Sequence, residues 1–125
     1  MNTLPKTESL KSKKLIRLLF SSGSQEFIYP FKIVYQILDK KEEHPALILI
    51  SVGKRKIKNA VDRNHIKRLF REVYRQNKHP LTELLQKTNI HIALGFIYVA
   101  EKNPEYSFIE EKVKVAIQVL VKRFS

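Results

Sequence analysis

Residues 46–77 read ALILISVGKRKIKNAVDRNHIKRLFREVYRQN, and this stretch decides the fold. It opens with a continuous apolar run, residues 46–52, which is typical of a buried β-strand. A basic loop covers residues 53–59, and residues 60–77 then have the periodicity of an amphipathic helix. At about 100° per residue, one arc of this helix holds the apolar side chains Ile66, Leu69, Phe70 and Val73. A strand followed by a helix with one apolar face predicts a helix packed on a sheet.

The other side of this helix carries cations spaced four residues apart: Arg63, Lys67, Arg71 and Arg75. A solvated helix face usually pairs such cations with acids, whereas here neighbouring cations repel each other by a few tenths of a kcal/mol. A bound polyanion relieves that repulsion. The basic loop leads directly to the helix N-terminus, where backbone N–H groups also favour phosphate. The stretch therefore predicts a polyanion-binding surface.

Composition places most of the charge in this one region. The chain has 125 residues, 43% of them hydrophobic, and a net charge of +12. Residues 54–78 hold ten cations and only two acids, which is +8 of that total. The length fits one domain, residues 1–125, in which the polar residues 1–9 are expected to form a loose arm. The absence of cysteine excludes a disulfide framework and a thiolate metal site, and it fits a reducing compartment.

No stretch of the sequence predicts a membrane segment. The longest nearly apolar run, residues 90–100, is far shorter than the roughly 20 residues that a spanning helix needs. The N-terminal residues lack the apolar region of a secretory signal. We therefore expect a cytoplasmic protein whose polyanionic partner is a nucleic acid rather than a membrane.

The rest of the chain predicts a small α/β (α+β) domain. The fold class is a two-layer sandwich, with a mixed sheet of three to four strands and three helices in the order α-β-β(-β)-α-β-α. The strand at 46–52 is expected to pair antiparallel with the strand before it, and the strand at 90–100 is expected to be central. The elements outside 46–77 are predicted as a helix at 10–22, a strand at 31–38, a turn or two of helix at 81–86, a strand at 90–100 and a helix at 107–124.

The titratable residues do not indicate an active site on the protein. The twelve acids are scattered, whereas two-metal nucleases need carboxylates converging on ions about 4 Å apart. The four histidines have no metal-ligand spacing. We therefore expect no catalytic residue, no metal bound by the protein alone and no small-molecule substrate.

Three other functions share part of this pattern. The first is a ribosomal-type structural RNA-binding protein, which would carry a similar excess of positive charge. A DNA-binding helix module usually belongs to an all-helical unit, whereas a strand and a long basic loop precede this helix. An autonomous nuclease is disfavoured by the scattered carboxylates.

The pattern of residues along the helix at 60–77 also resembles that of a known protein family. Its spacing resembles the RNR signature of the bacterial ribonuclease P protein subunit, at Ala60-Val61, Arg63-Asn64, Lys67-Arg68 and Arg71-Glu72. The resemblance extends over nearly the whole chain and is weaker outside residues 50–76. Two positions depart from the family pattern. His65 stands where the third signature residue is usually Arg, and Ile16 stands where the first helix often has an aromatic.

The resemblance implies a function. The protein would join a catalytic RNA subunit and promote endonucleolytic removal of the 5′ leader from precursor tRNA. Cleavage would take place on the RNA subunit with its Mg²⁺, and the protein would supply positioning and charge neutralisation. The resemblance also implies a left-handed connection around the signature helix.

The resemblance assigns residues to two surfaces. In the family, the signature helix and the loop before it face the catalytic RNA, and a cleft between that helix and the sheet binds the leader. The candidates for RNA contact are Lys54, Arg55, Lys56, Lys58, Arg63, Asn64, His65, Lys67, Arg68, Arg71 and Arg75. The candidates for the leader cleft are Ile16, Phe20, Tyr35, Asn64 and Arg68, in which the aromatic rings would stack on unpaired bases.

Overall fold

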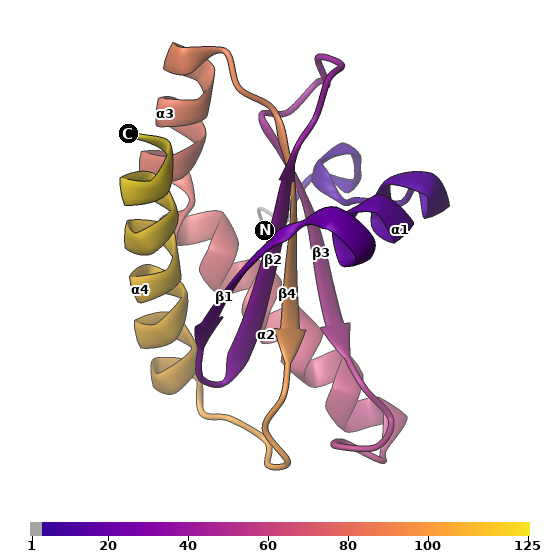
Figure 1. Cartoon of the computed structure of the whole chain (residues 1–125). Helices are drawn as coiled ribbons and strands as arrows, with labels where there is room; N and C mark the ends of the chain where they lie inside the picture. The colour runs from indigo at the N-terminus through magenta and orange to yellow at the C-terminus, as the bar shows by residue number, and fades with distance from the viewer. Residues whose placement is uncertain (1–3) are drawn as a thin grey trace.

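The computed structural model describes residues 4–125 and contains one four-stranded sheet (Figure 1). The strand order across the sheet is β1-β2-β4-β3. The strands are β1 (Ser24–Ile28), β2 (Phe31–Ile37), β3 (Ala46–Val52) and β4 (Ile92–Tyr98). The helices are η1, a 3₁₀ turn (Lys6–Glu8), α1 (Lys13–Ser22), α2 (Ala60–Asn77), α3 (His79–Thr88) and α4 (Tyr106–Phe124). The mixed α+β class predicted from the sequence is confirmed, although helices pack on both faces of the sheet rather than in the single layer expected.

The sheet has a separate apolar cluster on each face. The larger cluster joins one face to α2, α3 and α4, and includes Phe31, Phe70 and Phe96, whose rings contact one another edge-on or tilted. The smaller cluster lies on the other face and joins Leu19 of α1 to Val34 and Ala93. Figure 1 shows this division, with α1 in front of the strands and α2 behind them. We call the two faces the α1 face and the α2 face.

The pairing of β3 differs from the prediction. It was expected to lie antiparallel beside β2, but it pairs with β4 in parallel, while β4 pairs antiparallel with β2. The antiparallel prediction was wrong because β4, which is apolar on both faces, occupies the centre of the sheet. That central position of β4 was correctly predicted.

The connection from β3 through α2 to β4 is left-handed. In Figure 1 both strands point downward, β4 lies to the left of β3, and α2 passes behind the sheet. About 98% of such crossovers are right-handed. The family resemblance implied the rarer hand.

Two glycines allow α1 to lie close to the sheet. A Cβ on Gly23 would collide with the carbonyl oxygen of Leu19 and lie 3.0 Å from that of Tyr35. A Cβ on Gly95 would lie 3.0 Å from Val34 Cγ2 and 3.2 Å from Leu19 Cδ2. A side chain at Gly23 would force the end of α1 to shift, and one at Gly95 would press on the side chains of Val34 and Leu19.

The N-terminal residues are packed, which corrects the expected loose arm at 1–9. Residues 1–3 lie outside the described part of the chain, but η1 packs beside β3, and Ser9 bridges to Ile48 in parallel. The Glu8 carboxylate is 1% exposed and accepts hydrogen bonds from Lys78 Nζ at 2.7 and 2.9 Å. This buried ion pair attaches the segment to the junction of α2 and α3.

The number of helices also exceeds the prediction. Residues 4–125 form four α-helices rather than three, because residues 79–88 make the full helix α3 instead of a turn or two. Helix α1 begins at Lys13 rather than near residue 10, since the Ser12 hydroxyl accepts a hydrogen bond from Leu15 N. The optional extra strand does form, as β1.

Candidate nucleic-acid interface

The basic loop between β3 and α2 is held in place by the protein's own contacts. Ile57, 5% exposed, anchors the middle of the loop in the apolar cluster of the α2 face. Asn59 caps α2, its Oδ1 accepting a hydrogen bond of 2.8 Å from Val61 N. Arg63 Nη1 donates to the carbonyl oxygens of Ile57 and Lys58, both at 2.9 Å. The cations of the loop are therefore presented by an ordered backbone.

Helix α2 divides into the two faces predicted from its periodicity. Its bounds, Ala60–Asn77, match the prediction, and Ile66, Phe70 and Val73 are fully buried. The opposite side carries cations that form no ion pair with an acid within residues 4–125. Together with the loop, these free cations are Lys54, Arg55, Lys58, Lys67, Arg68 and Arg71. We call this set the basic surface.

Two of the predicted RNA-contact cations are already paired. Arg75 donates from Nη2 and Nε to the two oxygens of Glu72, at 2.6 and 3.3 Å. The hydrogen bond from Arg75 lowers the pKa of Glu72, and the same bond raises the pKa of Arg75. Lys56 Nζ lies 3.4 Å from Glu101 Oε1, which comes from the β4–α4 loop. The chain thus neutralises part of the charge that the sequence presents.

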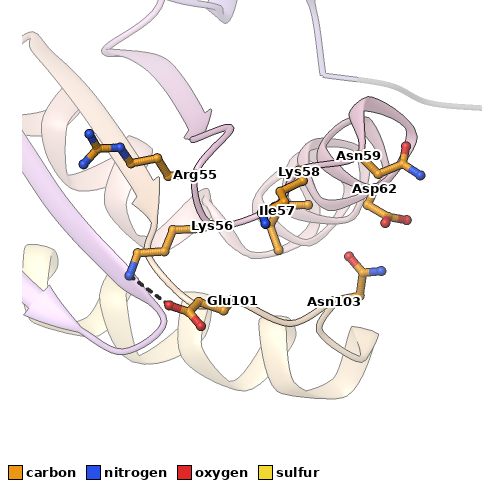
Figure 2. A pocket seen from close by; sticks show the side chains of 8 residues that line it. All are labelled: Arg55, Lys56, Ile57, Lys58, Asn59, Asp62, Glu101 and Asn103. Carbon is orange, nitrogen blue, oxygen red and sulfur yellow. Dashed lines mark hydrogen bonds and ion pairs between the residues drawn. The ribbon is translucent and has the colours of Figure 1, made fainter.

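The loop borders a polar hollow of about 560 Å³. Figure 2 shows Lys56 and its partner Glu101 on one side, and Asp62 and Asn103 facing the same opening on the other. Arg55 points away from these side chains. We call this space the basic hollow. Sequence reasoning missed Glu101 and Asn103 because they lie some forty residues from the loop, with no local signal that joins them to it.

The leader cleft between α2 and the sheet stays a prediction, and residues 4–125 show how its candidate side chains lie. The apolar face of α2 packs on the sheet, so its buried side chains Ile66, Phe70 and Val73 do not line an open cleft. Phe20 and Ile16 lie on α1, at the α1 face. Tyr35 points to the opposite face, where its ring packs edge-on against Phe124 with centroids 5.6 Å apart.

The other candidate residues are exposed on α2. Asn64 and His65 are solvent-accessible there, on the same helix as Arg68 of the basic surface. Phe20 is 45% exposed, which excludes the alternative that it is a core residue. The structure therefore brings Asn64, His65 and Arg68 together with the loop cations and separates them from Phe20 and Ile16.

Within residues 4–125, no group of three or more His, Asp or Glu side chains could hold a metal ion. In the same part of the chain, no helix is both long and apolar enough to cross a membrane.

Comparison with known proteins identifies relatives over nearly the full length. The family model described as Ribonuclease P matches residues 4–121. The ribonuclease P protein component of Porphyromonas gingivalis is 32% identical over 114 residues, covering 91% of this chain and 83% of that protein. The same component of Chlorobaculum tepidum is 36% identical over 106 residues, covering 79% of this chain and 69% of that protein.

Solved structures share the fold. The RNase P protein of Staphylococcus aureus superposes with a TM-score of 0.67 at 21% identity, covering 91% of this chain and 95% of that one. The RNase P protein of Thermotoga maritima gives a TM-score of 0.70 at 17% identity, covering 89% and 96%. At these identities the superpositions support the architecture of the sheet and helices.

Proposed function

This chain belongs to the ribonuclease P protein family, and from that premise we propose that it binds the catalytic RNA of the enzyme through the basic surface of α2 and the loop before it. The observation that carries the proposal is the ordered, unpaired charge on one side of α2. Arg68 and Arg71 are exposed and have no acidic partner within the described residues, while the other face of the helix is fixed in the core. A rigid helix that presents free guanidinium groups suits phosphate contacts, because Arg can donate two hydrogen bonds to one phosphate.

The second part of the proposal concerns precursor tRNA. Phe20 is an exposed aromatic at the last turn of α1, and Ile16 precedes it by one turn on the same side of the helix. Unpaired bases stack on exposed aromatic rings without strong sequence preference. We place the 5′ leader at this α1 site, and we assign Asn64, His65 and Arg68 to the α2 surface instead. Tyr35 does not belong to the proposed leader site, since its ring packs on Phe124 of α4.

The protein's own contribution to cleavage would be binding, positioning and charge neutralisation. When bound to its RNA, Mg²⁺ would supply the activated water and stabilise the leaving oxygen. The basic surface would lower the repulsion between the phosphates of the two RNAs, which favours assembly when few divalent ions are present. We therefore assign the bond-breaking step to the RNA subunit.

Binding to a bacterial ribonuclease P RNA tests this proposal. The double variant Arg68→Ala/Arg71→Ala is compared with Lys40→Ala/Lys41→Ala, which removes the same charge from the exposed turn at the other end of the sheet. We expect the α2 variant to bind at least tenfold more weakly, since each charged contact contributes about 1–3 kcal/mol. Equal weakening by both variants would show that only net charge matters and would contradict a defined surface.

A further inference from the structure

Three connections leave the sheet at the same end. The last row of paired residues is Ile28, Phe31, Tyr98 and Val52, so the β1–β2 turn, the β4–α4 loop and the β3–α2 loop all begin there. Figure 1 shows these three connections at the lower end of the molecule, away from α1. Residues that are distant in the sequence therefore form one continuous surface.

A second hollow lies beside the basic hollow on this surface. It has a volume of about 300 Å³, and the rings of Tyr29, Tyr98 and Phe108 form part of its lining. Asn103 lines both hollows, which makes them neighbours that share a wall. We call the second one the aromatic hollow.

The rings of the aromatic hollow are held in place. Tyr29 is 53% exposed, yet its ring packs edge-on against Phe108, with centroids 6.4 Å apart and an interplanar angle of 61°. Tyr98 is 2% exposed, and its hydroxyl donates a 2.6 Å hydrogen bond to the carbonyl oxygen of Lys102, which fixes the β4–α4 loop. An exposed ring that is already oriented loses little conformational freedom when a flat ligand stacks on it.

The charges around both hollows are mixed, and cations outnumber acids beside the loop. Lys102 and Glu105 both line the aromatic hollow. Lys112 Nζ lies 5.7 Å from the centroid of the Phe108 ring and 3.7 Å from Glu111. The adjoining basic hollow is lined by three cations of the loop, Arg55, Lys56 and Lys58, and by the acids Asp62 and Glu101. Among the three cations, Arg55 points away from the other side chains. A ligand that spans both hollows would thus meet aromatic rings at one end and more cations than acids at the other.

We propose that the two hollows form one binding site for an unpaired segment of RNA, with a base against Tyr29 and Phe108 and the adjoining phosphates at the β3–α2 loop. This combination of stacking rings and cations matches how proteins hold single strands. The inference rests on the proposed function and adds a second single-strand site, at the opposite end of the sheet from α1.

Fluorescence anisotropy with a labelled single-stranded RNA oligonucleotide of mixed sequence tests the site. Tyr29→Ala removes the ring, Tyr29→Phe keeps it, and Tyr106→Ala removes a tyrosine that points to Gln76 of α2 and lines neither hollow. We expect Tyr29→Ala to bind about 5- to 150-fold more weakly, as for the loss of one stacked base. Tyr29→Phe and Tyr106→Ala should bind as the unaltered protein does.

Three results would overturn the inference. Unchanged binding by Tyr29→Ala contradicts the site while leaving the proposed function intact, provided that the unaltered protein binds. Equal losses in Tyr29→Ala and Tyr29→Phe would show that the ring does not stack. If the unaltered protein does not bind the oligonucleotide but does bind a bacterial ribonuclease P RNA, the inference fails and the proposed function stands.

Titrations with whole partners then identify the source of the strand. A loss that appears with the catalytic RNA alone assigns the segment to that subunit. A loss confined to precursor tRNA that carries a leader assigns it to the leader. If neither complex is weakened by Tyr29→Ala, the site is not used in the assembled enzyme and the inference is wrong.

Discussion

At the scale of single residues, the cations of α2 have two different tasks. Arg63 donates to two carbonyl oxygens of the basic loop, whereas Arg68 is exposed and has no acidic partner within residues 4–125. The sequence presents both as members of one signature, because neither a hydrogen bond to the backbone nor an exposed side chain is visible in residue spacing. Only the fold separates the arginine that shapes the loop from the one that is free to contact RNA.

Replacement of these two arginines should therefore give different results. Arg68→Ala should weaken binding of the catalytic RNA about 5- to 150-fold and leave the thermal midpoint unchanged. Arg63→Ala should also lower the midpoint, since it leaves two loop carbonyls without a donor and each lost hydrogen bond costs about 1 kcal/mol. Binding titrations and thermal unfolding of both variants check this, and a matching pair of midpoints would contradict it.

The Lys56–Glu101 pair predicts a gain of binding. Both side chains are well exposed, so the pair itself contributes little to stability. Glu101→Gln removes a negative charge from the edge of the basic hollow and frees Lys56 for phosphate. We expect tighter RNA binding at low salt and the same affinity at high salt, where exposed charges are screened. Weaker binding of this variant would indicate that Glu101 itself contacts the RNA.

At the scale of secondary-structure elements, local pattern and long-range pairing differ in how far they can be predicted. The bounds of α2 follow from periodicity and from the Asn59 cap, and both are local. The partner of β3 does not follow, because pairing depends on β4, which lies forty residues later. Helix α3 was underestimated because Pro80 reads as a stop, although Pro is also favoured in the first turn of a helix.

The N-terminal segment was misjudged for a similar reason. Its polar sequence predicts a loose arm, but Glu8 finds Lys78 only in the folded chain. Lys78→Ala should destabilise the protein by about 3–5 kcal/mol, since the nearly inaccessible Glu8 carboxylate loses its counter-ion. The double variant Glu8→Gln/Lys78→Met should lose less than Lys78→Ala in denaturant unfolding. A smaller loss for Lys78→Ala than for the double variant would contradict the buried pair.

The Glu72–Arg75 pair makes the free energy of unfolding depend on pH. The hydrogen bond from Arg75 lowers the pKa of Glu72 in the folded protein. The ionised pair therefore stabilises the fold at pH values above the pKa that Glu72 has in the unfolded chain. The contribution is lost as pH falls through the lower, folded pKa. The free energies of unfolding of the unaltered protein and of Glu72→Gln should therefore differ at neutral pH and become equal in acid. A difference that grows as pH falls would contradict this sign.

At the scale of the whole molecule, charge and architecture act together. The domain places the basic surface on the α2 side of the sheet and exposed Phe20 on the α1 side. The two hollows lie at one end of the sheet. The sequence predicted the class, the charge and the family, whereas the residue spacing alone could not show which candidate side chains face which side of the sheet. The left-handed connection was expected only from the family resemblance, since general sheet statistics favour a right-handed connection.

The salt dependence of RNA binding measures how many of these charges are used. If the six free cations of the basic surface each neutralise one phosphate, the slope of log affinity against log salt should be about −5 for a duplex-like target. Binding isotherms at several salt concentrations give this slope. A value near −1 would mean that few of these cations contact phosphate.

The central claim is that this protein assists a catalytic RNA and does not itself cleave. Its most direct test is cleavage of precursor tRNA at low Mg²⁺ by a bacterial ribonuclease P RNA, by the protein, and by the two together. We expect rapid release of the 5′ leader only from the combination, and slower release when Arg68 and Arg71 are both replaced by Ala. Cleavage by the protein free of RNA, or no stimulation of the RNA by the protein, would contradict the account.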